Sequence, residues 1–319
     1  MHAFVTGATG FVGSAVVRSL LRRGIEVKVL ARQSSDLRNI AGLDIEIFYG
    51  DLFDEEELTR ALRGCDVLYH VAAYYSTDEA DSAIMYEVNV RGTKTVMRAA
   101  LRAGVQRVVH TSTIGTIGQP EDGSLATEET PFNLWDTGSH YVKSKYLGEI
   151  AALAMNDQGL SVVVVNPCAP VGPRDIKPSS TGQRIVDYLN GKMPSFVPGG
   201  INFISVHDVA EGEVLAAERG RAGEKYILGQ KEGNLLLSDF LNLMEQVSGV
   251  KRPRTARHGL SIRLPMRRKA SDTVPNFRPR ALTCDPSKAI RDLGLPQTPL
   301  AIAFAEAVAW FRDNGYVRT

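Results

Sequence analysis

Three glycines at a fixed spacing constrain the fold of this chain more than any other feature of its sequence. Gly7, Gly10 and Gly13 follow the apolar segment 3–6 and open the amphipathic pattern 12–23. Glycine allows a sharp turn at the first position, close approach of a pyrophosphate at the second, and tight packing of helix on strand at the third. The start of the helix adds free N–H groups that attract an anion. The pattern therefore predicts a dinucleotide-binding turn between a strand and a helix. Its expected cofactor contacts are Gly7, Thr9, Gly10, Phe11, Val12 and Gly13.

The first half of the chain alternates short apolar runs with amphipathic helical patterns. Runs this rich in Val, Ile and Leu are typical of buried parallel strands, and their alternation with helices indicates a doubly wound α/β fold. The expected strands are 3–6, 26–31, 44–49, 67–70, 107–111 and 162–166. The expected helices are 12–23, 55–62, 83–103 and 141–155. We therefore expect a Rossmann domain over residues 1–167.

The regularity ends after Pro167, where prolines and glycines become frequent. Short elements are expected at 203–206, 208–218 (a helix), 225–228 and 238–247, and the tail 286–316 looks helical. Residues 168–319 are therefore predicted to form a smaller α/β domain that binds the substrate. Some of its elements are expected to return to the Rossmann sheet.

The charge balance argues against a polyanionic partner. Lys and Arg number 37 and Asp and Glu 36, a formal net charge of +1, so we expect neither nucleic acid nor a membrane as a partner. The basic stretch 251–269 is interpreted as a solvated helix and loop, with an anion site as the alternative. No apolar run approaches the ~20 residues that span a bilayer. No signal-peptide pattern precedes the first strand, and we expect a cytoplasmic protein.

The cysteines give no indication of a disulfide framework or a metal site. Cys65, Cys168 and Cys284 are few, odd in number and widely spaced. This usage fits a reducing compartment. No metal is expected.

The residue after the second strand bears on the choice of cofactor. An NAD-binding Rossmann unit usually has Asp or Glu there, which accepts a hydrogen bond from the ribose 2′-hydroxyl. This chain has Arg32, followed by Ser35 and Arg38. A guanidinium beside hydroxyl donors suits a 2′-phosphate, and a surface arginine flanking a strand is the alternative. The sequence favours NADP over NAD.

Two further strand ends carry residues suited to the cofactor. Asp51 and Leu52 follow the third strand, and Ala72 and Ala73 follow the fourth, at the carboxyl ends where open α/β sheets bind ligands. Asp51 is expected to accept a hydrogen bond from the adenine amino group. The small Ala72 and Ala73 leave room for the ribose and pyrophosphate. His70, at the strand end itself, is interpreted as structural rather than catalytic.

A tyrosine and a lysine open the helix expected at 141–155. The spacing of Tyr141 and Lys145 puts both on one helix face. A free phenol has a pKa of about 10, and a neighbouring ammonium favours its phenolate. The fifth strand ends in Thr111, Ser112 and Thr113, whose hydroxyls can bind a substrate oxygen beside the tyrosine. The combination predicts a general acid–base site.

Eight short motifs along the chain, taken together and in their order, indicate a protein family. They are 7–13, 51–52, 72–73, 89–93, 111–113, 141–145, 166–167 and 171–173. In this order they resemble the extended short-chain dehydrogenases/reductases, in the epimerase/dehydratase and dihydroflavonol-reductase branch. Segments 171–178, 224–229 and 310–316 are most similar to the hopanoid-associated sugar epimerase group. The resemblance covers essentially the whole chain.

The resemblance implies a role for each matching residue. Tyr141 would be the acid/base, and Lys145 would bind the nicotinamide ribose and tune the tyrosine. Family members usually have a serine as the third catalytic hydroxyl. Here the best-aligned position is Thr113, with Ser112 as its neighbour and alternative. Pro167 would lie beside the nicotinamide. Family members also generally form homodimers, here through helices 83–103 and 141–155.

The family includes two kinds of reaction on small molecules. Sugar-nucleotide epimerases commonly carry an arginine just before the strand near residue 203, where this chain has Ile201 or Asn202. That departure weakens a nucleotide-sugar epimerase/dehydratase with tightly bound NAD, and the expected NADP tilts toward net reduction. A carbonyl reductase of dihydroflavonol-reductase type therefore competes strongly with a sugar epimerase. A non-catalytic dinucleotide-binding regulator is a third hypothesis, but such proteins lose the tyrosine or the lysine. The candidate substrate contacts are Tyr75, Ser112 and Arg184.

Overall fold

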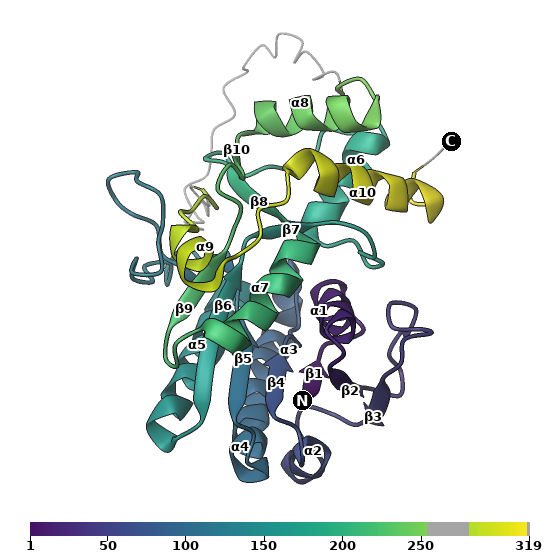
Figure 1. Ribbon diagram of the computed structural model, residues 1–319. Coiled ribbons are helices and arrows are strands. Elements are labelled where there is room, and N and C mark those ends of the chain that lie inside the picture. Colours follow the sequence, from purple (N-terminus) through teal and green to yellow (C-terminus); the bar gives the residue numbers. More distant parts are fainter. Residues whose placement is uncertain (254–280, 318–319) are drawn as a thin grey trace.

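A seven-stranded sheet forms the centre of the computed structural model, which describes residues 1–253 and 281–317 (Figure 1). The strand order is β3-β2-β1-β4-β5-β6-β9, and every neighbouring pair is parallel. The strands are β1 (His2–Thr6), β2 (Glu26–Ala31), β3 (Glu46–Tyr49), β4 (Val67–His70), β5 (Arg107–Thr111), β6 (Ser161–Pro167) and β9 (Lys225–Leu228). The order reverses between β1 and β4, which is the doubly wound Rossmann arrangement. The predicted fold class is confirmed.

Helices cover both faces of this sheet because successive strand residues point to opposite sides. Val5 and Val109 belong to one apolar core, with α1 (Phe11–Arg22), α7 (Val206–Arg219) and α9 (Ser287–Leu293). Their neighbours Phe4 and Val108 belong to the other core, with α2 (Glu55–Leu62), α4 (Thr93–Ala103) and α5 (His140–Leu153). Figure 1 shows α1 and α7 in front of the strands and α4 behind them.

A smaller layer of sheet and helices lies above the carboxyl ends of the large sheet (Figure 1). Its strands are β7 (Ala169–Val171), β8 (Ile201–Ser205) and β10 (Asn234–Leu235). Its helices are α6 (Ser180–Leu189), α8 (Leu237–Ser248) and α10 (Leu300–Asp313). Phe203, Phe240 and Phe304 pack in its core, with ring centroids 5.4, 5.6 and 5.8 Å apart. Although they follow residue 167, β9 and α7 pack with the large sheet, so the domain division at residue 167 stays a prediction.

Two expected helices are interrupted in the structure. The pattern 83–103 divides into α3 (Ser82–Tyr86), a π-helical segment (Glu87–Gly92) and α4. The wider turn lies where α5 comes close, since a Cβ on Gly148 would stand 2.3 Å from the carbonyl oxygen of Asn89. The tail 286–316 divides into α9 and α10, because Gly294 ends α9 in a left-handed conformation (φ +76°) and Pro296 follows it.

Two cysteines that are far apart in the sequence meet in the fold. The sulfurs of Cys168 and Cys284 lie 3.2 Å apart as buried free thiols. Spacing along the chain gave no indication of this contact. Cys65 is buried elsewhere, in the core against α2.

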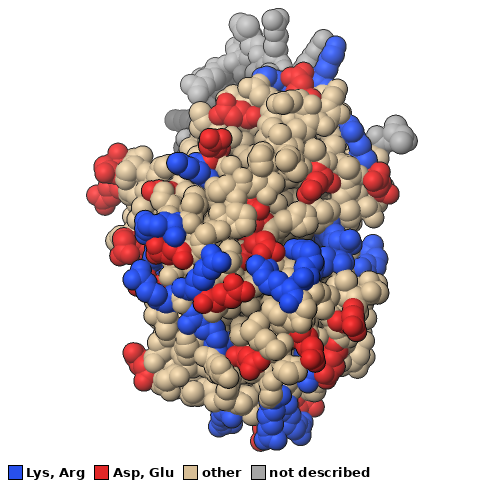
Figure 2. All heavy atoms as spheres, in the orientation of Figure 1, with Lys and Arg blue, Asp and Glu red and all other residues tan. Residues whose placement is uncertain are grey.

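On the face of the molecule shown in Figure 2, basic and acidic side chains are interspersed, and uncharged surface lies between them. The basic stretch expected at 251–269 lies, from residue 254 on, outside the described residues. In the described part of the chain, no helix is long and apolar enough to cross a membrane.

Candidate active site

The glycine turn joins β1 to α1 in the way the sequence predicts. Gly7 has φ +73°, and a Cβ on it would stand 2.7 Å from the backbone nitrogen of Ala72. A Cβ on Gly13 would stand 2.2 Å from the carbonyl oxygen of Gly7. No side chain caps α1 at Gly10, which leaves the N–H groups of the first turn facing outward. The turn is a narrow backbone cradle that fits a pyrophosphate.

Polar side chains fix the ends of the two strands beside this turn. The Thr6 hydroxyl lies 2.8 Å from Nδ1 of His70, and it accepts a hydrogen bond from the backbone N–H of Ala72. Nε2 of His70 lies 3.1 Å from the hydroxyl of Thr93. Burial lowers the pKa of His70 to about 3, so the ring is neutral. His70 therefore holds β1, β4 and α4 together, and Ala72 and Ala73 come directly after it.

The residues expected at the adenosine end lie at the ends of β2 and β3. Arg32 is exposed after β2, its N–H donating to the hydroxyl of Ser35, and no described carboxylate pairs with its guanidinium. Arg38 instead donates to Asp36, at 2.9 Å, and this hydrogen bond lowers the pKa of that carboxyl. After β3, Asp51 accepts from the N–H of Phe53. The neighbouring Leu52 side chain packs beside Gly92, at the end of the π-helical segment that leads into α4.

Tyr141 and Lys145 lie in the first two turns of α5, which Ser139 caps through the N–H of Val142. Burial raises the pKa of Tyr141, and a hydrogen bond with Thr113 opposes this effect. The ammonium of Lys145 is buried and donates to the carbonyl oxygen of Thr111 at 2.7 Å. Burial lowers the pKa of Lys145 to about 8.

The two candidate hydroxyls after β5 point in different directions. Thr113 contacts Tyr141, and its hydroxyl also accepts from the N–H of Gly115. The Ser112 hydroxyl points into the protein and donates to Glu149 at 2.6 Å. The structure thus brings Thr113 and Tyr141 together. Ser112, expected as a substrate contact or as the alternative catalytic hydroxyl, is buried away from the substrate side.

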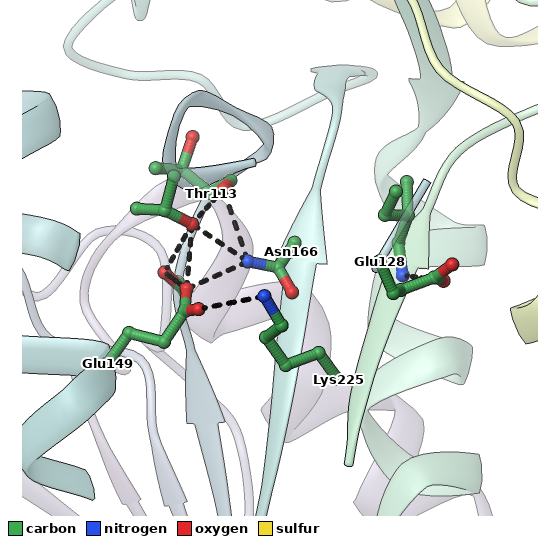
Figure 3. A network of polar contacts seen from close by, with 8 residues as sticks. Thr113, Glu128, Glu149, Asn166 and Lys225 are labelled. Carbon is green, nitrogen blue, oxygen red and sulfur yellow. Dashed lines mark hydrogen bonds and ion pairs between the residues drawn. The ribbon is translucent and has the colours of Figure 1, made fainter. Parts of the chain in front are cut away.

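A buried glutamate on α5 organises the loop that carries Thr113 (Figure 3). One carboxylate oxygen of Glu149 accepts from Ser112, from Thr116 at 2.7 Å and from the amide of Asn166 at 3.0 Å. The other oxygen lies 3.6 Å from the ammonium of Lys225 on β9. Figure 3 shows these side chains converging from α5, the loop after β5, β6 and β9. Glu149 therefore fixes the backbone on which Thr113 sits.

A second buried glutamate approaches the lysine from the other face of the sheet. Glu213 on α7 accepts from the Thr111 hydroxyl at 2.6 Å, and burial raises its pKa to about 8. Glu149 and, when it is ionised, Glu213 raise the pKa of Lys145 against the effect of burial. Lys145 thus lies between two buried carboxyl groups that favour its protonated form.

The residues expected to contact the substrate lie on the loop after β4 and on α6. The ring of Tyr75 packs edge-on against Tyr141, with centroids 4.8 Å apart, and 48% of the residue is exposed. Its hydroxyl contacts Ser180 at the start of α6. Arg184 lies one turn further along α6 and donates to the carbonyl oxygen of Ser195. Pro167 ends β6 at the same edge of the sheet.

Comparison with known proteins identifies the family. Residues 3–229 match the model of the NAD dependent epimerase/dehydratase family. The chain belongs to this family. The predicted resemblance to extended short-chain dehydrogenases/reductases is therefore confirmed, and the enzyme binds a nicotinamide dinucleotide and acts on a small molecule.

Relatives of the enzyme include reductases and enzymes of sugar metabolism. A putative dihydroflavonol 4-reductase of Synechocystis sp. is 39% identical, over 99% of this chain and 96% of the relative. Sterol demethylase protein B of Methylococcus capsulatus is 37% identical, over 99% and 100%. The structure of DesIV, a dTDP-glucose 4,6-dehydratase of Streptomyces venezuelae, is similar with a TM-score of 0.81, at 29% identity over 100% of this chain and 99% of that one.

Two buried residues of the site, Glu149 and Glu213, were not predicted from the sequence. Glu149 follows Lys145 by four residues, so helical spacing places it on the lysine's face and could have found it. Glu213 comes from α7, and only the tertiary fold brings it to β5. Within the described residues, no group of three or more His, Cys, Asp and Glu side chains is arranged to hold a metal ion.

Proposed function

We propose that this enzyme uses NADPH to reduce a ketone or an aldehyde. The observation that carries the proposal is the contact between Thr113 and Tyr141 beside the buried Lys145, at the sheet edge that holds the glycine turn. These are the groups that a hydride-transfer site needs, because they bind and protonate a carbonyl oxygen. The similarity to a putative dihydroflavonol 4-reductase supports the same reaction class.

The protonation states suit reduction. NADPH, when bound at the glycine turn, would supply the hydride for the carbonyl carbon. Tyr141 donates its phenol proton to the carbonyl oxygen, which the Thr113 hydroxyl holds in place. Burial raises the pKa of Tyr141 and keeps the phenol protonated at neutral pH. The ammonium of Lys145, held between two carboxyl groups, then stabilises the phenolate that the proton transfer leaves.

Replacing Tyr141 by phenylalanine tests this function. Tyr141→Phe removes only the hydroxyl, so we expect turnover of a surrogate aldehyde to fall about 10²–10⁴-fold while NADPH still binds. Tyr146→Phe is the matched control, since Tyr146 lies on the same helix and stacks on Phe132 outside the site. Wild-type turnover in Tyr141→Phe, with an unchanged pH profile, would remove the proposal.

The preference for NADPH is proposed to come from Arg32. Its guanidinium is exposed at the end of β2 and lacks a described carboxylate partner, so it is free for a 2′-phosphate. Arg38 would have to exchange its pairing with Asp36 to join it. We expect Arg32→Ala to weaken NADPH binding about 10- to 100-fold, the value of a charge-assisted hydrogen bond, without changing NADH binding.

Nicotinamide fluorescence titration measures both cofactors. Arg63→Ala, at an exposed arginine without a described partner, is the control. Binding of NADH that equals or exceeds that of NADPH, unchanged in Arg32→Ala, would refute the preference for NADPH.

A nucleotide-sugar epimerase with tightly bound NAD is the second candidate, favoured by the similarity to dTDP-glucose 4,6-dehydratase. Against it, the start of β8 offers Ile201 and Asn202, both buried, and the Asn202 amide donates to the carbonyl oxygen of Gln230. Stoichiometric NAD released on denaturation, with conversion of a nucleotide sugar, would favour the epimerase. Binding without any turnover would favour a regulator. The hopanoid-associated subgroup and the cytoplasmic location stay predictions.

We also propose that the enzyme is a homodimer. Ile84 on α3 and Ile150 on α5 are 43% and 46% exposed. α3 and α5 contact one another, and each carries one of these exposed isoleucines. Two copies joined through these helices would bury both isoleucines in a four-helix interface. Light scattering should show a dimer that Ile84→Lys together with Ile150→Lys converts to monomer. A wild-type monomer at micromolar concentration would contradict the proposal.

A further inference from the structure

Arg184 is a half-buried cation without a counter-ion. Its Nε donates to the carbonyl oxygen of Ser195 at 2.8 Å, and no described carboxylate pairs with it. Burial lowers its pKa, and the only described group that opposes this effect is Tyr75. An arginine stays protonated in such surroundings, so a positive charge is held here at a cost in hydration.

The terminal nitrogens of Arg184 are its unused donors. Arg107, also half-buried, uses both terminal nitrogens, on the Ser161 hydroxyl and on the carbonyl oxygens of Ala216 and Gly220. In Arg184 only Nε has a described hydrogen-bond partner. The contact with Ser195 accounts for the orientation of the side chain but not for its charge. The terminal N–H groups remain for a ligand.

The position of Arg184 connects it to the catalytic tyrosine. Ser180 and Arg184 lie four residues apart on α6, about 5–6 Å between their Cβ atoms. Ser180 contacts the hydroxyl of Tyr75, whose ring packs against Tyr141. Tyr75 also influences the pKa of Arg184, so the guanidinium lies close to the ring that packs against Tyr141.

We propose that Arg184 binds a carboxylate on the substrate, so that the enzyme acts on a ketone or aldehyde that is also a carboxylic acid. The inference rests on the proposed function. One guanidinium beside the neutral hydroxyls of Tyr75 and Ser180 balances a monoanion, whereas a phosphate or diphosphate needs more positive charge. The planar fork of arginine also fits the two oxygens of a carboxylate.

A matched pair of aldehydes tests the inference by turnover. 4-Carboxybenzaldehyde carries a carboxylate, and methyl 4-formylbenzoate is its uncharged methyl ester. We expect Arg184→Gln to lower kcat/KM for the acid about 10- to 100-fold, the value of a charge-assisted hydrogen bond, and to leave the ester within about twofold. Glutamine still offers an N–H to Ser195, so the melting temperature should not change. Arg63→Gln is the control at an exposed arginine.

The outcomes separate this inference from the proposed function. An equal fall for acid and ester in Arg184→Gln, or no fall for either, would overturn the carboxylate site while reduction itself stands. If the wild type reduces neither aldehyde, the proposed function fails on this probe, and calorimetry decides the site. Benzoate should then bind the NADPH-saturated protein more tightly than benzamide, and Arg184→Gln should abolish the difference. Equal binding of benzoate and benzamide, or tighter binding of phenyl phosphate than of benzoate, would overturn the carboxylate.

Discussion

The glycine turn and helix α6 face the same site, but their atoms are fixed in different ways. Around the turn, backbone atoms leave no room for a Cβ at Gly7 or Gly13, and buried hydrogen bonds hold the strand ends. On α6, the functional atoms belong to the side chains of Ser180 and Arg184, and Tyr75, which contacts Ser180, is about half exposed. Changes in the cofactor half should therefore cost stability along with activity. Changes in the substrate half should cost activity alone.

Glu149 should show the largest effect, because buried hydrogen bonds to it hold Ser112 and Asn166 at the ends of β5 and β6, much as the strand ends beside the glycine turn are held. Glu149→Ala leaves Lys225, Ser112 and Asn166 without their shared partner. A buried polar group left without its partner typically costs about 1–3 kcal/mol, and several lose theirs here, so we expect the free energy of unfolding to fall by roughly 3–5 kcal/mol. Turnover should fall as well, because the loop with Thr113 loses its anchor.

Urea unfolding measures the change. Glu56→Ala, at an exposed position of α2 without a described partner, should stay within about 0.5 kcal/mol of the wild type. A Glu149→Ala protein as stable as Glu56→Ala would show that the network contributes little to holding the site.

Gly13 tests the backbone cradle itself. A Cβ there would overlap the carbonyl oxygen of Gly7, so Gly13→Ala must push the turn away from α1. Overpacking of this kind costs about 1–3 kcal/mol, and we expect NADPH binding to weaken with it. Gly42→Ala is the control, because Gly42 is left-handed (φ +73°) but has open space around it. It should lower the melting temperature slightly and leave NADPH binding unchanged. Wild-type NADPH affinity in Gly13→Ala would contradict the cradle.

The same contrast explains how far the sequence could be interpreted. The turn was predictable because Gly7 and Gly13 meet steric requirements that few other residues satisfy, and the Tyr141–Lys145 spacing follows from helix geometry. Adjacent side chains after a strand point to opposite sides, so the sequence predicted that Ser112 and Thr113 would differ. It could not predict which of the two faces Tyr141. Glu213 reaches β5 from α7, 102 residues beyond Thr111 in the chain, and no local sequence pattern predicts such a contact.

Tyr75 should show the smallest effect and sharpens the comparison from the substrate side. Tyr75→Phe keeps the ring against Tyr141 and removes only the hydroxyl that contacts Ser180. A neutral hydrogen bond at a partly exposed site is worth about 0.5–1 kcal/mol, so KM for 4-carboxybenzaldehyde should rise about two- to fivefold. The turnover number should stay unchanged, which is the signature of a contact made equally in the ground state and the transition state. The melting temperature should not move, because no buried group loses its partner. If Tyr75→Phe instead lowered the melting temperature as much as Gly13→Ala, the substrate half would be as rigidly built as the cofactor half, and exposure would be a poor guide to where this enzyme tolerates change.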